Sequence, residues 1–202
     1  MTILHHFETD AFSNGQVDSK IWLCKELERI IPTLPRPFRS GQAAPVVWIL
    51  GGWYGVLSFL LLSRGNVGIA NIRSFDQDEH ATEVADQINN NWVINGWRFK
   101  AFTADANWLE YAHATQYGPA PDIIINTASE HFYSSDWFDR LPEDVLVVVQ
   151  SNDMVHHEHL FLHKSLHAHK KEFPLTHTLF EGKMMFTYPD WSFTRFMTIG
   201  YK

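Results

Sequence analysis

Apolar and polar residues alternate along this chain in blocks that suit strands and helices in turn. Short runs at residues 46–50, 123–126 and 145–150, apolar except for Asn126 and Gln150 at the ends of the last two, predict strands that are buried on both faces. Longer stretches with apolar residues at helical spacing, at 17–31 and 79–90, predict amphipathic helices. Further expected elements are strands at 68–75 and 97–103, helices at 56–63, 137–141 and 154–171, and a short helix or turn at 107–114.

Regular alternation of strands with helices predicts an α/β fold built on a doubly wound, mostly parallel sheet. The end of the chain breaks this order. Residues 175–180, 183–188 and 194–201 all read as strands, and Glu181-Gly182 is a turn signal between the first two. We therefore expect a C-terminal antiparallel hairpin at the edge of the sheet.

Composition narrows the class of protein. The 202 residues suffice for one domain with a sizeable core, and 45% of them are hydrophobic. A net charge of -7 disfavours a nucleic-acid partner. The single cysteine, Cys24, excludes an internal disulfide and fits a reducing compartment. No signal-like start and no long apolar run is seen, so we expect a cytoplasmic protein without a membrane partner.

A glycine turn is the clearest functional signal. Gly51-Gly52-Trp53-Tyr54-Gly55 lies between an apolar strand and an apolar helix, and Asp76 ends the next strand. Strand, glycine turn, helix, strand and carboxylate is the order that a nucleotide-like cofactor needs. The alternatives are an ordinary turn for the glycines and a helix cap or solvated loop acid for Asp76.

At this point the chain resembles the class I, Rossmann-like S-adenosylmethionine (SAM)-dependent methyltransferases. The resemblance covers residues 44–202, which would form the cofactor-binding core of a single domain, 1–202, with a helical extension at 1–43. It rests on the order of several weak motifs and on the terminal hairpin. The resemblance implies SAM as cofactor, with these binding residues: Gly51, Gly52, Trp53, Tyr54 and Gly55 at its amino-acid end, Asp76 at the ribose, Asp105 and Ala106 at the adenine, and Asn126 facing the methyl group. The alternative for Asp105 is the cap of a helix that starts there.

Two departures from the family pattern keep other functions open. Ile49 stands where the family has an acid, and Trp53 stands where it has its middle glycine. One alternative is therefore a catalytically inactive binding protein with this fold, and another is transfer of a different group from the same cofactor. A nicotinamide-dependent oxidoreductase is a third, against which the terminal hairpin counts.

The second candidate site follows the fourth strand. There Asn126-Thr127-Ala128-Ser129 leads into Glu130 and His131. Methyl transfer requires mainly that the acceptor be held in line with the donor, with a base where the acceptor carries a proton. We expect Glu130 or His131 to be that base, acting on a small-molecule or peptide-like acceptor. The alternative is a capped turn with exposed polar residues.

Six histidines crowd residues 156–169. In a helix, His159, His163 and His167 would share one face, with the spacing of helical zinc sites. We interpret them as a polar helix face and predict no metal site, with a metal-binding or pH-sensitive surface as the alternative.

Overall fold

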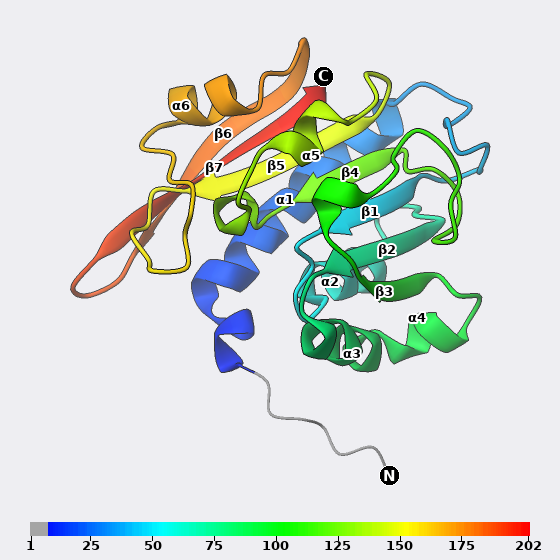
Figure 1. Cartoon of the computed structure of the whole chain (residues 1–202), viewed down its shortest axis with the longest axis horizontal. Coiled ribbons are helices and arrows are strands. Elements are labelled where there is room, and N and C mark those ends of the chain that lie inside the picture. Colours follow the sequence, from blue (N-terminus) through cyan, green and yellow to red (C-terminus); the bar gives the residue numbers. More distant parts are fainter. Residues whose placement is uncertain (1–7) are drawn as a thin grey trace.

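The computed structural model describes residues 8–202, which form a seven-stranded sheet in the order β3-β2-β1-β4-β5-β7-β6 (Figure 1). Strands β1 to β5 are mutually parallel, and β7 is antiparallel to both β5 and β6. The predicted α/β fold with a C-terminal antiparallel hairpin is confirmed. The strands are β1 (Val46–Leu50), β2 (Asn71–Asp76), β3 (Phe99–Thr103), β4 (Ile123–Asn126), β5 (Leu146–Asn152), β6 (His177–Thr187) and β7 (Ser192–Tyr201).

Helices connect the strands and cover the sheet. The α-helices are α1 (Asn14–Ile30), α2 (Val56–Arg64), α3 (Glu79–Ile88), α4 (Asn90–Ile94), α5 (Asp136–Asp139) and α6 (Leu166–Glu172). Short 3-10 turns lie at η1 (Thr9–Phe12), η2 (Ile31–Thr33), η3 (Ala106–Trp108) and η4 (Ser129–His131). None of the helices in residues 8–202 is both long and apolar enough to cross a bilayer.

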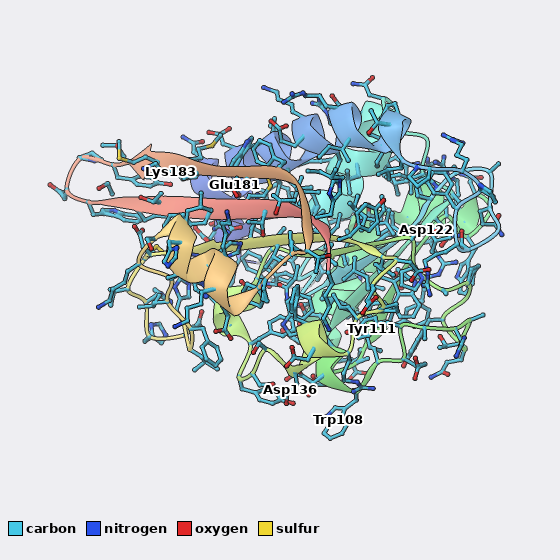
Figure 2. The ribbon with its side chains drawn as sticks, turned by 90° about the horizontal axis from the view of Figure 1, so that it is seen from above. Trp108, Tyr111, Asp122, Asp136, Glu181 and Lys183 are labelled. Atoms are coloured by element: carbon cyan, nitrogen blue, oxygen red, sulfur yellow. The ribbon has the colours of Figure 1, made fainter. Side chains whose placement is uncertain are left out.

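Successive residues of β1 point to opposite faces of the sheet, and each face has its own core. Val47 and Ile49 pack in one cluster with residues of α1 and α2, whereas Trp48 and Leu50 pack in a second cluster with residues of η3 and α5. Figure 2 shows α1 and α6 on opposite sides of the sheet. Burial on both faces explains why these strands are apolar throughout.

The helix predicted at 154–171 is wrong over most of its length. Only α6, which begins at Leu166, is helical, and residues 153–165 are irregular. The backbone N–H groups of Leu160 and Phe161 donate to the carbonyl of Glu130, at 2.7 and 3.1 Å, instead of to a helix of their own. The shared face of His159, His163 and His167 therefore does not exist.

The hairpin turn also lies elsewhere than predicted. β6 continues through Glu181 and Gly182, which pair with residues of β7, and the chain reverses after Thr187, where Tyr188 N–H donates to the carbonyl of Trp191. A Cβ at Gly182 would lie 2.8 Å from the Phe180 ring, so this glycine allows close ring packing and marks no turn. The prediction of a turn at Glu181-Gly182 is wrong because, in sequence, a glycine inside a strand resembles a glycine in a turn.

The two neighbours of β1 lie on opposite sides of it in the sheet: the chain passes from β1 to β2 and β3 on one side and then returns to β4 on the other. Such a change of direction opens a crevice at the carboxyl ends of the strands. Here Leu50 pairs with Phe75 and with Asn126, so the three loops that follow β1, β2 and β4 start side by side.

Candidate functional site

A cavity of about 850 Å³ lies at these carboxyl ends. Its walls come from the loops after β1, β2, β3 and β4, from α1, and from the irregular segment 154–160. That volume is in the range of small-molecule and cofactor sites. Most residues predicted from the sequence to form a site line it: Gly51, Gly52, Trp53, Tyr54, Asp76, Ala106, Glu130 and His131.

The glycines are required by close contacts in the turn. Gly51 has φ 64°, and a Cβ there would lie 2.9 Å from Cβ of Ala128. A Cβ on Gly52 would lie only 1.9 Å from Oγ of Ser74 on β2. Gly55, with φ 68°, immediately precedes α2 and receives a hydrogen bond on its carbonyl from the Asn89 side chain. The turn is thus tightly fitted against β2 and the β4 loop.

Trp53 occupies the position where the related motif has a glycine, and its backbone conformation is one that favours glycine. Its φ is 45°, in the left-handed region that favours glycine. The indole stacks on the Tyr54 ring with centroids 4.9 Å apart, and both rings line the cavity wall. Trp53 therefore adopts a backbone conformation that favours glycine and adds an aromatic surface to the turn.

Asp76 is held against this turn. One carboxylate oxygen accepts the backbone N–H of Trp53 at 2.8 Å, and the other accepts that of Asp78 at 3.1 Å. Burial raises the pKa of Asp76, and these backbone hydrogen bonds oppose the shift. A carboxylate has about four lone-pair sites, so acceptor capacity toward the cavity remains.

Asp105 and Asn126 are used differently. Asp105 accepts the Asn107 N–H at 2.9 Å, which caps η3, and its other oxygen accepts the Tyr133 hydroxyl at 3.0 Å. Asn126 is fully buried and accepts the Ala128 N–H at 2.9 Å. Together with Gly55, these two residues lie outside the cavity lining that the described residues form. Their neighbours Ala106 and Ala128 do line it.

Glu130 and His131 lie in η4 on the opposite side of the cavity. The Glu130 side chain is 2% exposed, receives a hydrogen bond from the Asn152 amide, and has Oε1 3.6 Å from Nη1 of Arg195. Asn152 and Arg195 are paired residues of β5 and β7. The His131 ring is exposed at the cavity wall and contacts the His159 ring edge to face, with centroids 4.8 Å apart.

Lys20 is a cavity residue that the sequence did not reveal. It lies on α1, is 9% exposed, and donates to Oε1 of Gln16 at 2.6 Å. Burial, reinforced by Arg195, lowers the pKa of Lys20 to about 7. In the sequence Lys20 is an ordinary polar position of an amphipathic helix, and only the packing of α1 beside η4 brings it to the site.

No protein-family model matches the sequence, and no curated protein matches it either. Solved structures do match. The N-methyltransferase NodS from Bradyrhizobium japonicum WM9, in complex with S-adenosylhomocysteine (SAH), aligns with a TM-score of 0.64 and 10% identity, over 98% of this chain and 94% of that one. Magnesium protoporphyrin IX methyltransferase from Synechocystis PCC 6803, with bound SAM, aligns at 0.60 and 12% identity, over 96% and 86%.

A putative RNA methyltransferase from Pyrococcus horikoshii aligns with a TM-score of 0.60 and 14% identity, over 100% of this chain and 90% of that one. At such low identities the likeness concerns the fold. The chain therefore has the Rossmann-like fold of the class I SAM-dependent methyltransferases.

Proposed function

We propose that the protein binds SAM at the carboxyl ends of β1 and β2 and transfers its methyl group to a small-molecule or peptide-like acceptor. The observation that carries the proposal is the glycine turn clasped to Asp76 at the point where the strand order reverses. In this proposal Gly51 and Gly52 approach the amino-acid end of the cofactor, Asp76 accepts the ribose hydroxyls, and the backbone of Ala106 meets the adenine.

The acceptor then occupies the part of the cavity beside η4. As the methyl carbon bonds to a lone pair of the acceptor, its bond to the sulfonium sulfur breaks and that electron pair stays on sulfur, giving SAH. A proton on the acceptor leaves to a base, and His131, whose ring is exposed at the cavity wall, is the proposed base. The Glu130 carboxylate, held by Asn152, places a negative charge beside His131.

Charge along the cavity wall favours neutral or cationic acceptors. Lys20 is the one lysine or arginine in the described lining. The same lining holds six acidic residues: Glu8, Asp10, Asp76, Asp78, Glu130 and Glu158. One of the structural neighbours is a putative RNA methyltransferase, but a phosphate backbone would be repelled by these acids. We therefore favour a small or peptide-like molecule over a nucleic acid.

Calorimetric titration with SAH and SAM tests the cofactor. We expect binding by the wild-type protein and a loss of roughly 1–3 kcal/mol of binding free energy in Asp76→Ala, because the ribose hydroxyls lose their acceptor. Asp190→Ala, which removes an exposed acid from the hairpin turn, is the matched control and should bind as the wild type does. If the wild-type protein binds neither SAH nor SAM, the proposal is refuted. If Asp76→Ala and Asp190→Ala bind with equal affinity, the ribose role of Asp76 is rejected.

A further inference from the structure

Three side chains with metal-ligating atoms converge beside the proposed acceptor position. Glu130 and His131 come from η4, and His159 comes from the segment between β5 and α6. One potential ligand atom from each residue lies within 4.8 Å of the other two. A tetrahedral ion with bonds about 2.0 Å long holds its ligand atoms about 3.3 Å apart, so small side-chain movements would close the set around an ion.

The imidazole of His159 is already oriented for this purpose. Its Nδ1 lies 2.8 Å from the carbonyl oxygen of Met154. A carbonyl can only accept, so Nδ1 carries the proton and Nε2 presents its lone pair. A carbonyl that receives the second ring N–H is the usual support of a histidine that binds metal.

An independent sign is the unsatisfied carboxylate oxygen of Glu130. Oε1 is engaged by Asn152 and lies near Arg195, whereas Oε2 is buried without a hydrogen-bond partner among the described residues. Burying an unpartnered oxygen of this kind costs free energy, and a bound cation would remove that cost. Arg195 reduces the net charge of the site but contacts the opposite oxygen.

The segment that supplies His159 is fastened to Glu130 itself. The N–H groups of Leu160 and Phe161 both donate to the Glu130 carbonyl. His159 is therefore held at a fixed distance from η4 although it lies 28 residues further along the chain. These contacts explain why the segment departs from the helix that its sequence predicts.

We propose that Glu130, His131 and His159 bind a divalent transition-metal ion, for which Zn²⁺ is the probe. Two imidazoles and one carboxylate are a donor set that such ions accept while keeping coordination positions open. The open positions would face the cavity. Where the proposed methyl transfer also holds, they would take the nucleophilic oxygen, nitrogen or sulfur of the acceptor, so the acceptor class would be molecules with a metal-coordinating donor atom.

With an ion bound, His131 is a ligand and cannot also be the base. An acceptor bound to the ion would lose its proton to solvent water more easily, because the positive charge stabilises the conjugate base. The methyl-transfer proposal survives without the ion, since His131 then keeps its free imidazole. The ion-binding proposal likewise stands without methyl transfer.

Calorimetry with Zn²⁺ and the visible absorption of added Co²⁺ test the site on the full chain without any acceptor. We expect one ion per chain and at least about a tenfold loss of affinity in His159→Ala. The matched control is His157→Ala, because His157 belongs to the same histidine run but its side chain is 81% exposed and lies outside the cavity lining. It should bind as the wild type does.

Glu130→Gln should also weaken binding, and circular dichroism checks that this variant folds. If the variant does not fold, the comparison of His159→Ala with His157→Ala alone tests the metal site. No ion bound by the wild type, or equal affinity in the His159 and His157 variants, would overturn the site. A loss confined to His157→Ala would place the ion at the exposed pair formed by His157 and Glu158. Titration of SAH in the presence of a chelator separates these outcomes from failure of the cofactor proposal.

Discussion

The two halves of the cavity are built by different means. The half proposed for the cofactor (the cofactor half) consists of short loops that directly follow β1, β2 and β3, and its key contact, from Trp53 N–H to Asp76, joins neighbouring strands. The half proposed for the acceptor (the acceptor half) gathers residues from α1, η4, the segment after β5, and β7. There Glu130 meets Arg195, 65 positions away along the chain. The comparison teaches that the first half follows from strand order, whereas the second depends on tertiary packing.

Lowering the pH should therefore destabilise the acceptor half before it destabilises the cofactor half. His169 joins α6 to β5 and β7, because its ring nitrogens lie 2.7 Å from Oγ of Ser151 and 3.1 Å from Oγ1 of Thr198. Burial, reinforced by the adjacent His163, lowers the pKa of His169 to about 3. In the unfolded chain a histidine takes up a proton near pH 6.5.

The unfolded state thus binds more protons than the folded state between pH 6.5 and 3, and stability falls as the pH falls through this window. The loss attributable to His169 has an upper bound of about 5 kcal/mol, at about 1.4 kcal/mol per pKa unit. Denaturant unfolding across this window should show a shallower acid dependence in His169→Gln than in the exposed control His167→Gln. Hydrogen exchange should rise in residues 153–173 before it rises in the glycine turn. Identical acid profiles for the two variants would contradict this assignment.

A smaller effect is expected from breaking the cofactor half at one contact. In Gly52→Ala the new Cβ would meet Oγ of Ser74 at 1.9 Å, so strand or turn must shift. Overpacking of this kind costs about 1–3 kcal/mol of stability. SAH affinity should fall with it, because the turn is displaced.

The control adds Ser74→Ala to Gly52→Ala, which gives a double variant. It removes Oγ, and the next contact of the new Cβ is then 3.2 Å, to Cβ of residue 74. The double variant should therefore regain most of the stability lost in Gly52→Ala, as measured by denaturant unfolding in a double-mutant cycle. Strict additivity of the two substitutions would show that the turn is not fitted against β2 as described.

The same division explains what could be predicted from the sequence. Sheet class, terminal hairpin, glycine turn and Asp76 follow from apolar runs and from residues that end strands, both local properties. Glu130 and His131, which line the cavity, were candidates on the same basis, because they follow a strand that ends at the ligand edge. Lys20 and Arg195 gave no signal, since a charged residue in an amphipathic helix or a strand is ordinary until packing buries it.

Local patterns also misled where tertiary contacts outweighed them. Residues 154–165 have helix-compatible spacing, but the N–H groups of Leu160 and Phe161 bond to the carbonyl of Glu130 instead. For Asp105 the sequence left ligand binding and helix capping open, and in the fold its carboxylate caps η3 and accepts the Tyr133 hydroxyl. A capping role and a ligand role produce the same residue type at the same strand end, so only the geometry distinguishes them.

The smallest expected effect concerns Trp53, where the family pattern and this chain differ. A residue with a Cβ costs roughly 1–2 kcal/mol in the left-handed region, and Trp53 has φ 45°. Trp53→Gly and Trp53→Ala both lose the stacking on Tyr54, but only the glycine variant relieves this strain. We therefore expect Trp53→Gly to be about 1 kcal/mol more stable than Trp53→Ala in denaturant unfolding.

Trp108 supplies the matched comparison, because it is 78% exposed, projects from the surface in Figure 2, and does not have positive φ. There the order should reverse, with Trp108→Ala more stable than Trp108→Gly, since glycine gains only unfolded-state freedom at an ordinary φ. The sign change between the two positions isolates backbone strain from the loss of an indole. If alanine were the more stable replacement at both positions, the turn after β1 would not hold residue 53 in the left-handed region, and the turn geometry assigned to the cofactor half would have to be redrawn.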